Sequence, residues 1–162
     1  MFERILVPLD GSRFSARALR YGIEVARHFS AEVILIRVVP PASLTVVTAP
    51  PEAVGSPVAT EISAQAADTK NRNNIYRAHR YLRRKIRELA AKDIKGSHHV
   101  ALGSPAESIM NCCRKADVDL IVMTTHGRSG LKRAFAGSVT DEVIRSSGVP
   151  VLVIRPGGKR HK

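Results

Sequence analysis

The segment EVILIRVV (Glu32 to Val39) is nearly continuous in apolar residues, and most of these are β-branched. A strand with one face in water alternates apolar and polar residues, whereas a strand of a parallel sheet covered on both faces reads as a continuous apolar run. The segment therefore predicts a buried strand of a parallel sheet.

Four more short aliphatic segments lie along the chain and predict further strands. They are Arg4 to Leu9 (RILVPL), His98 to Leu102 (HHVAL), Asp119 to Thr124 (DLIVMT) and Val149 to Ile154 (VPVLVI). Pro150 has no N–H to donate, so we expect the last of these strands at an edge of the sheet.

Helical patterns separate these strands. A helix after Ser12 has apolar positions spaced by three and four residues, at Phe14, Ala18, Tyr21, Val25 and Phe29. Another begins at Ser104 and Pro105, with Glu107 completing a capping box. The last runs from Val139 to Ser147 and ends at Gly148.

The alternation of strands and helices predicts an α/β fold, because parallel strands need crossover connections. We expect one domain with a doubly wound, five-stranded parallel sheet and helices on both faces. In such sheets ligands bind beyond the carboxyl ends of the strands. Residues 1–156 form this domain and residues 157–162 a basic tail. A Pro-rich segment at about 41–69 reads as an irregular insertion, with the next helix beginning near Glu61.

The composition narrows the class of protein further. The 162 residues carry 44% hydrophobic and 25% charged residues, as in ordinary globular domains. No apolar run approaches the length of a membrane span, and the first residues do not resemble a signal peptide. We therefore expect a soluble, cytoplasmic protein. Cys112 and Cys113 are adjacent, and we expect one to pack and the other to be partly exposed.

The formal net charge of +12 is concentrated in two places. Residues 70–95 hold ten basic residues and two acidic ones, and four more basic residues lie from Arg155 onward. The basic helix could bind nucleic acid or an acidic membrane through phosphates. The favoured alternative is an ordinary outer helix with its cations in solvent. Its inward stripe is Ile75, Ala78, Leu82, Ile86 and Leu89.

The segment MTTHGRSGLKRAFAGSVT (Met123 to Thr140) carries the chemistry. Glycines let backbone N–H groups approach a ligand, and the amides that begin a helix favour an anion. The hydroxyls of Ser138 and Thr140 can add donors, and Arg128 adds positive charge. The parts predict a phosphate cradle. The chain contains neither a GxxxxGK[ST] P-loop nor a GxGxxG fingerprint, so fast hydrolysis of the P-loop type is not expected.

This segment resembles the universal stress protein family. The family's pattern is a glycine, two residues, a glycine, nine residues, and then glycine with Ser or Thr. Gly127 and Gly137-Ser138 match its second and third elements, and Thr124 occupies the place of the first glycine. The opening ILVPLDGS, the strand EVILIRVV, the segment GSP at residues 103–105 and the ending VPVLVIRP also match in kind and order. Thr124 is disfavoured if that position needs a positive φ, and it fits if only a small side chain is needed.

The resemblance implies a Rossmann-like fold of the adenine nucleotide alpha hydrolase-like kind and binding of ATP. It places Asp10 at the nucleoside and the backbone of Pro8, Leu9 and Val38 around adenine. Met123, Thr124, His126, Gly127 and Arg128 would then line the path of the ribose and phosphates. Gly137, Ser138, Val139 and Thr140 would hold phosphates, with Mg²⁺ or Mn²⁺ bridging them, and no residue of the chain is expected to bind metal directly. The resemblance also implies a homodimer through Val149 to Ile154.

Three functions follow from the sequence. The first is an ATP-binding stress protein that acts as a sensor or regulator, without a catalytic residue. The second is an adaptor for nucleic acid or an anionic surface through residues 70–95 and the tail. The third is a slow ATPase or nucleotidyl-transfer enzyme, for which His126 is the candidate base.

Overall fold

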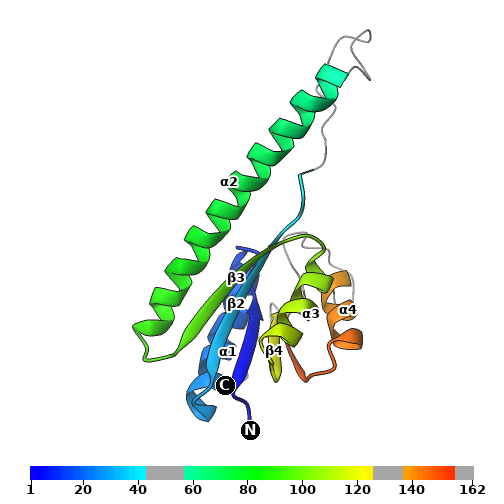
Figure 1. Cartoon of the computed structure of the whole chain (residues 1–162). Coiled ribbons are helices and arrows are strands. Elements are labelled where there is room, and N and C mark those ends of the chain that lie inside the picture. The colour runs from blue at the N-terminus through cyan, green and yellow to red at the C-terminus, as the bar shows by residue number, and fades with distance from the viewer. Residues whose placement is uncertain (43–56, 126–136, 156–162) are drawn as a thin grey trace.

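The computed structural model describes residues 1–42, 57–125 and 137–155. Its elements run in the order expected for an α/β protein (Figure 1). They are β1 (Arg4–Pro8), α1 (Arg13–Phe29), β2 (Glu32–Val39), α2 (Pro57–Ala90), β3 (Gly96–Leu102), α3 (Pro105–Lys115), β4 (Leu120–Thr124), α4 (Ser138–Ser146) and β5 (Val151–Ile154). Each predicted strand is present, with bounds that differ by up to two residues.

The sheet has the strand order β3-β2-β1-β4-β5, and every neighbouring pair is parallel. The chain winds outward in one direction from β1 to β3 and then in the other from β4 to β5. The doubly wound parallel sheet is therefore confirmed, with β5 at an edge. The order reverses between β1 and β4, which is where a fold of this kind leaves a crevice for a ligand.

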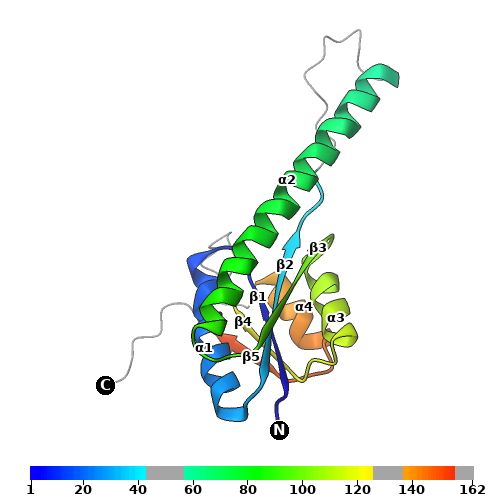
Figure 2. The ribbon, with the colours of Figure 1, turned by 60° about the vertical axis from the view of Figure 1, so that its left-hand side comes forward.

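Two helices cover each face of the sheet (Figure 2). One layer of core joins α1 and α2 to Val7 and Leu35, and the other joins α3 and α4 to Leu6 and Ile36. Successive residues of a strand point to opposite faces. Both faces of β1 and β2 are thus buried, which accounts for their continuous apolar sequences.

Helix α1 begins after Ser12, as predicted. The Ser12 hydroxyl accepts a hydrogen bond from the Ser15 amide at 3.1 Å and caps the helix. Of the predicted apolar positions only Ala18 is fully buried, while Phe14 and Tyr21 are exposed. The residues that the helix buries against the sheet are Ser15, Ala18, Leu19, Gly22, Ile23 and Ala26, so its inward face is made largely of smaller side chains.

Helix α3 has Ser104 at its N-cap and Pro105 in its first turn, as predicted. The capping box is wrong, because the Ser104 side chain makes no capping hydrogen bond. The Ser104 carbonyl instead accepts the Ser108 amide at 3.0 Å, so the helix starts with its main chain alone.

Helix α2 is the largest departure from the prediction. It has 34 residues, about 50 Å at 1.5 Å per residue, and begins at Pro57. The irregular insertion predicted for about 41–69 is therefore wrong from residue 57 onward, and residues 43–56 lie outside the described residues. Figure 1 shows the N-terminal half of α2 extending past the carboxyl edge of the sheet. Ala78, Leu82 and Leu89 are fully buried, which confirms the predicted inward stripe.

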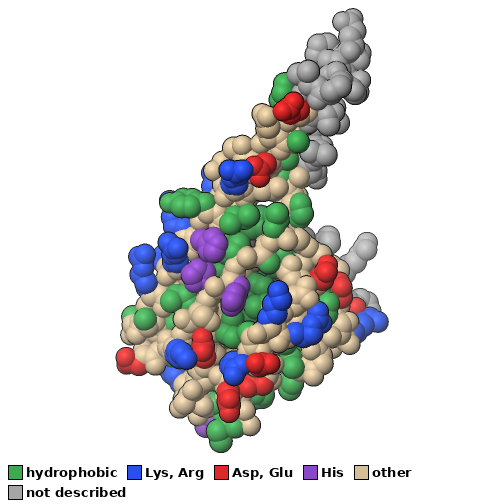
Figure 3. All heavy atoms as spheres, in the orientation of Figure 1, with side chains coloured by type: hydrophobic (Ala, Val, Ile, Leu, Met, Phe, Trp, Pro, Cys, Tyr) green, Lys and Arg blue, Asp and Glu red, His purple; other side chains and the backbone are tan. Residues whose placement is uncertain are grey.

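The basic residues of α2 lie mostly in solvent (Figure 3). The stripe packs on the sheet and the cations remain outside, as the favoured alternative for this helix expected. The predicted tail at residues 157–162 lies outside the described residues. Within the described ranges, none of the helices is long and apolar enough to cross a membrane.

The two cysteines lie on α3 as expected, with Cys113 buried and Cys112 half-buried. Burial raises the pKa of Cys112 to about 11 and raises that of Cys113 as well. Both thiols are therefore protonated at neutral pH, and neither is a ready nucleophile.

Candidate functional site

A cavity of about 890 Å³ lies at the carboxyl edge of the sheet, where the strand order reverses. The ends of β1, β2 and β4 form its floor, and α2, α3 and the start of α4 form its walls. It brings together ten of the predicted site residues: Pro8, Leu9, Asp10, Val38, Met123, Thr124, Gly137, Ser138, Val139 and Thr140. His126, Gly127 and Arg128 lie outside the described residues.

Asp10 lies two residues after the end of β1 and lines this cavity. Its Oδ1 accepts a hydrogen bond from the Ser12 amide at 2.9 Å. Its Oδ2 is buried and has no hydrogen-bond partner in the described part of the chain. A buried acceptor without a partner is uncommon in folded proteins and calls for a donor.

The charge of Asp10 follows from its surroundings. Burial by itself raises the pKa of Asp10, but the hydroxyls of Ser12 and Ser15 and the Ser12 amide favour the carboxylate. The pKa therefore lies below its ordinary value of 3.8. At neutral pH the side chain accepts hydrogen bonds and donates none, so its complement in a ligand is a hydroxyl or an amino group.

Arg37 lines the cavity and lies against Gly11, the residue after Asp10. Gly11 has a φ of +85°, and a Cβ there would lie 3.2 Å from both terminal nitrogens of Arg37. The Arg37 guanidinium also lies over the Tyr81 ring, 5.1 Å from its centroid. The glycine thus permits both the turn after β1 and the close approach of the guanidinium.

The start of α4 faces the cavity from the end of β4. Its N-cap residue is Gly137, so the helix has no side-chain cap. The Gly137 amide donates to the Thr125 carbonyl at 2.6 Å. The amides of Ser138, Val139 and Thr140 have no partner within the helix, because the first turn of a helix leaves its N–H groups unpaired. These amides and the helix dipole favour an anion.

Thr140 has a structural part in this arrangement. Its buried hydroxyl donates to the Thr124 carbonyl at 2.9 Å and fixes the start of α4 to the end of β4. The sequence predicts this hydroxyl as a donor to phosphate, but in the structure its proton is already donated to the Thr124 carbonyl. Ser138, which is exposed, carries the hydroxyl that faces outward at this helix start.

Thr124 sits at the end of β4 with ordinary extended backbone. Among the described non-glycine residues, positive φ occurs only at Ser30, Asp93 and Asp117. Thr124 is also paired with Ile154 across β4 and β5. The position therefore needs no positive φ, and of the two alternatives the structure supports the one in which Thr is accommodated.

Sequence reasoning missed the residues that α2 and α3 contribute to the cavity. On the side of α3, Pro105 and Ile109 join Val38 and Met123 in an apolar wall. On the side of α2, the wall is polar and contains Arg37, Asn74 and Arg77. Pro105 stood in a segment that matched the family, but Asn74 and Arg77 carried no signal in the sequence. They reach the site only because α2 extends past the sheet.

The described side chains offer no ready metal centre. In the described ranges, no three His, Cys, Asp or Glu side chains lie together as a metal site would require. Hydrogen-bond donors, an anionic acceptor and an apolar wall instead surround the cavity. This donor set suits an organic anion with a hydroxyl-bearing middle and a flat apolar end.

These features place the chain among doubly wound α/β proteins with a ligand crevice at the switch point of the sheet. The model of the universal stress protein family matches residues 1–155. The chain belongs to the universal stress protein family.

Individual relatives agree with this assignment. Universal stress protein YxiE of Bacillus subtilis is 31% identical over 160 residues, which cover 96% of this chain and 100% of that protein. Universal stress protein MJ0531 of Methanocaldococcus jannaschii is 30% identical over 158 residues, covering 96% of this chain and 83% of that protein.

Solved structures show the same fold. The structure of hypothetical protein MJ0577 of Methanocaldococcus jannaschii has a TM-score of 0.80 at 26% identity and covers 98% of this chain and 99% of that chain. A universal stress protein family member of Arabidopsis thaliana, solved with AMP bound, has a TM-score of 0.60 at 15% identity, with coverages of 96% and 93%. Another universal stress protein, solved in complex with cAMP, has a TM-score of 0.57 at 19% identity, with coverages of 95% and 97%.

Proposed function

We propose that this protein binds ATP in the cavity at the switch point and acts as a nucleotide-dependent sensor or regulator in a stress response. The observation that carries the proposal is the buried, unpartnered Oδ2 of Asp10 in the wall of a cavity that also meets the uncapped start of α4. An adenine nucleotide has matching groups: ribose hydroxyls that donate, phosphates that accept, and a flat base. Two relatives of the same fold were solved with AMP or cAMP.

The arrangement of the cavity implies the order in which the phosphates, the ribose and the base would lie along the sheet edge. The first-turn amides of α4 would hold the phosphates, and Asp10, next along the sheet edge, would accept from a ribose hydroxyl. The base would then lie at the end of β2, beside Val38. His126, Gly127 and Arg128 remain predicted contacts along the phosphate path.

A divalent cation such as Mg²⁺ or Mn²⁺ would reach this site with the nucleotide. Its oxygen ligands would come from the phosphates and water, because the described part of the chain brings no set of three metal-ligating side chains together. The cation would offset phosphate charge next to the Asp10 carboxylate.

We propose that the site binds nucleotide for signalling and does not catalyse rapid hydrolysis. The lining groups are apolar residues, main-chain amides, hydroxyls and the side chains of Arg37, Asn74 and Arg77, and the only carboxylate among the described lining residues is that of Asp10. Because its lowered pKa keeps it ionised, Asp10 is a poor general base at neutral pH. We also propose that the protein acts in the cytoplasm.

We propose a homodimer that forms through β5, including Val149 and Pro150 before it. The exposed side chains of Leu152 on β5 and Ile144 on α4 support this surface. Binding of nucleic acid through the exposed cations of α2 stays an alternative, which a steep loss of affinity with salt would reveal.

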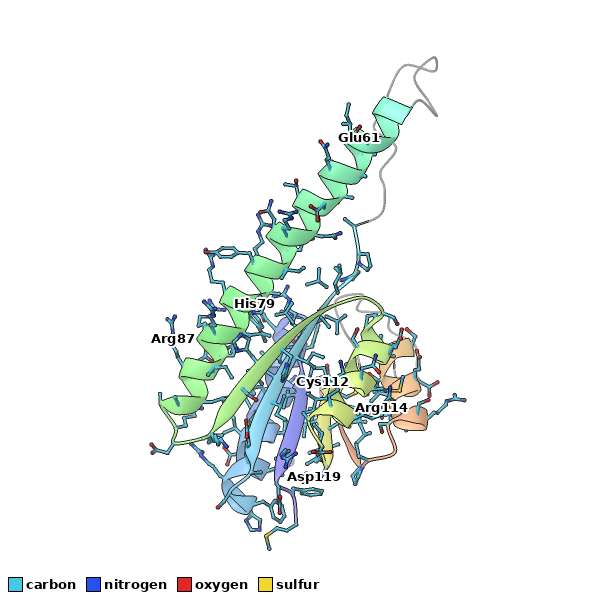
Figure 4. All side chains as sticks on the ribbon, in the orientation of Figure 1. Glu61, His79, Arg87, Cys112, Arg114 and Asp119 are labelled. Atoms are coloured by element: carbon cyan, nitrogen blue, oxygen red, sulfur yellow. The ribbon has the colours of Figure 1, made fainter. Side chains whose placement is uncertain are left out.

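The test compares two carboxylates that differ in position but share a local arrangement. Asp119 also has one buried oxygen without a partner in the described residues, while its other oxygen accepts the Glu3 amide at 2.7 Å. It precedes β4 at the opposite edge of the sheet, as Figure 4 shows. Asp10→Asn keeps an oxygen for the Ser12 amide and removes the charge. Asp119→Asn likewise keeps an oxygen for the Glu3 amide and removes the charge, but at a site away from the cavity.

Calorimetry with ATP and Mg²⁺ on each purified protein gives the answer. A hydrogen bond to a charged group contributes about 1.5–3 kcal/mol, so Asp10→Asn should weaken binding by about 10- to 100-fold. Asp119→Asn should bind as the unmodified protein does. Failure of the unmodified protein to bind millimolar ATP would refute the proposal. Mass spectrometry of the protein as purified should also detect adenine nucleotide.

A further inference from the structure

Helix α2 brings two polar side chains, those of Asn74 and Arg77, to the cavity beside the first residues of its inward stripe. The helix packs on the sheet through Leu89, Leu82 and Ala78, all fully buried. Asn74 lies four residues before Ala78 and therefore occupies the next position of the same row. It is half-buried, and with Arg77 it lines the cavity. The carboxamide of Asn74 and the guanidinium of Arg77 thus face the cavity next to Ile75 and Ala78, the first residues of the inward stripe.

A hydrogen bond fixes this part of α2 to the exit of β2. The Ala42 amide donates to Oδ1 of Asn71 at 2.7 Å. Asn71 lies about one turn before Asn74, so the chain that leaves β2 runs beside this turn of the helix. Val38 and Pro40 line the same cavity as Asn74 and Arg77. The end of β2 and this face of α2 therefore line the same cavity.

The polar groups of this wall differ in how they are engaged. Arg37 lies against Gly11 and over the Tyr81 ring, which holds its guanidinium in place. Arg77 lies four residues before Tyr81 on the same side of the helix. Neither Asn74 nor Arg77 has a hydrogen bond or ion pair with the residues that the structure describes. Both are available to a ligand.

We propose that Asn74 and Arg77 recognise the base of the bound nucleotide, an inference that rests on the proposed function. The ends of β4 and β2 are separated by two strand spacings, about 10 Å. A nucleotide with its phosphates at α4 and its ribose at Asp10 thus extends its base to the α2 wall. The Asn74 carboxamide offers one donor and one acceptor, the pair that matches the amino group and ring nitrogen of adenine. Guanine presents an acceptor in place of that amino group. The planar Arg77 guanidinium stacks on the base.

The chain supplies a matched control for each residue. Asn73 and Arg80 are exposed residues of the same helix and do not line this cavity. The variants Asn74→Ala and Arg77→Ala are compared with Asn73→Ala and Arg80→Ala. All four replace a helical residue by the best helix former, so helical content by circular dichroism should be retained. Calorimetry measures the Kd of each full-length protein for ATP, GTP and adenosine.

The two residues should give different signatures. Asn74→Ala should weaken ATP by about five-fold, the range of one hydrogen bond, and leave GTP nearly unchanged, so that the preference for ATP shrinks. Arg77→Ala should weaken ATP and adenosine by the same factor, because its contact is with the base. The Asn73 and Arg80 variants should bind as the unmodified protein does.

Two results would overturn the inference while leaving the proposed function intact. One is unchanged affinity for ATP in both Asn74→Ala and Arg77→Ala. The other is an Arg77→Ala protein that loses affinity for ATP but not for adenosine, which would place the guanidinium on the phosphates. Absence of ATP binding by the unmodified protein is a different result, and it would refute the proposed function together with this inference.

Discussion

Gly137→Ala is a test of the start of α4 as the phosphate site. A Cβ at Gly137 would lie 2.8 Å from the carbonyl oxygen of Thr125. The φ of Gly137 is −55°, which alanine adopts freely. The alanine is therefore disfavoured by a steric clash and not by its backbone angles. The clash is with a main-chain oxygen, which cannot rotate away as a side chain could. The same oxygen accepts the Gly137 amide at 2.6 Å, so the change strains the bond that joins the two segments.

The expected loss is large for one methyl group. Relieving the contact moves α4 away from β4, and overpacking of this kind costs about 1–3 kcal/mol. The three first-turn amides move with the helix, away from the positions that a phosphate would occupy. If most of this energy appears as lost binding, the affinity for ATP falls by about 10- to 100-fold, since each 1.4 kcal/mol is a factor of ten.

Gly148→Ala is the matched control. Gly148 follows α4 at its other end, has a φ of +69°, and has nothing within 4 Å of an added Cβ. Alanine there strains the backbone and destabilises the fold by about 1 kcal/mol, without touching the cavity. Calorimetry with ATP and Mg²⁺, together with thermal unfolding, should show both variants destabilised and only Gly137→Ala impaired in binding. A folded Gly137→Ala protein with unmodified affinity would refute the reasoning, as would equal losses in the two variants.

Two further predictions concern the surfaces away from the cavity. Leu152→Lys on β5 should convert the proposed dimer to a monomer, as measured by light scattering. Leu102 is an exposed leucine on the opposite edge strand, so Leu102→Lys should leave the mass unchanged. A dimer that survives Leu152→Lys would exclude the β5 edge as the interface. Burial, His79 and Arg83 lower the pKa of His98 below 6.5, so the unfolded chain binds a proton first and stability should fall as pH drops below about 6.5. In urea unfolding from pH 8 to 5, His98→Gln should show a shallower loss of stability, and an identical pH profile would contradict this cause.

The sequence predicted the sheet and its order of elements because buried parallel strands leave a strong local signal. It did not predict which face of α1 packs on the sheet. The aromatic Phe14 and Tyr21 have helical spacing, yet a second set with the same period includes Gly22 and Ala26. A Cβ at Gly22 would lie 3.0 Å from a methyl of Val7, so small residues let α1 lie close to β1. Period alone cannot distinguish two such faces.

The start of α2 was predicted near Glu61, four residues after its observed start at Pro57. Residues 61–73 are largely exposed, so no apolar row marks where this part of the helix begins. Their alanines, glutamine and lysine are good helix formers, and Pro57 occupies the first position, where its missing N–H has no consequence. Composition that suggested an irregular segment was thus compatible with helix. The extension is what brings Asn74 and Arg77 to the cavity.

The family's glycine pattern becomes more informative once each position has a physical reason. At Gly137 a Cβ would collide with main chain, so the contact itself demands glycine. At Thr124 the main-chain carbonyl makes the contact with α4, because it accepts a hydrogen bond from the Thr140 hydroxyl. The residue lies in extended strand geometry, which any side chain can adopt. Replacement of glycine by threonine there keeps this function of the main chain. A departure from the pattern at position 124 is therefore compatible with an intact site, whereas the same departure at 137 would not be.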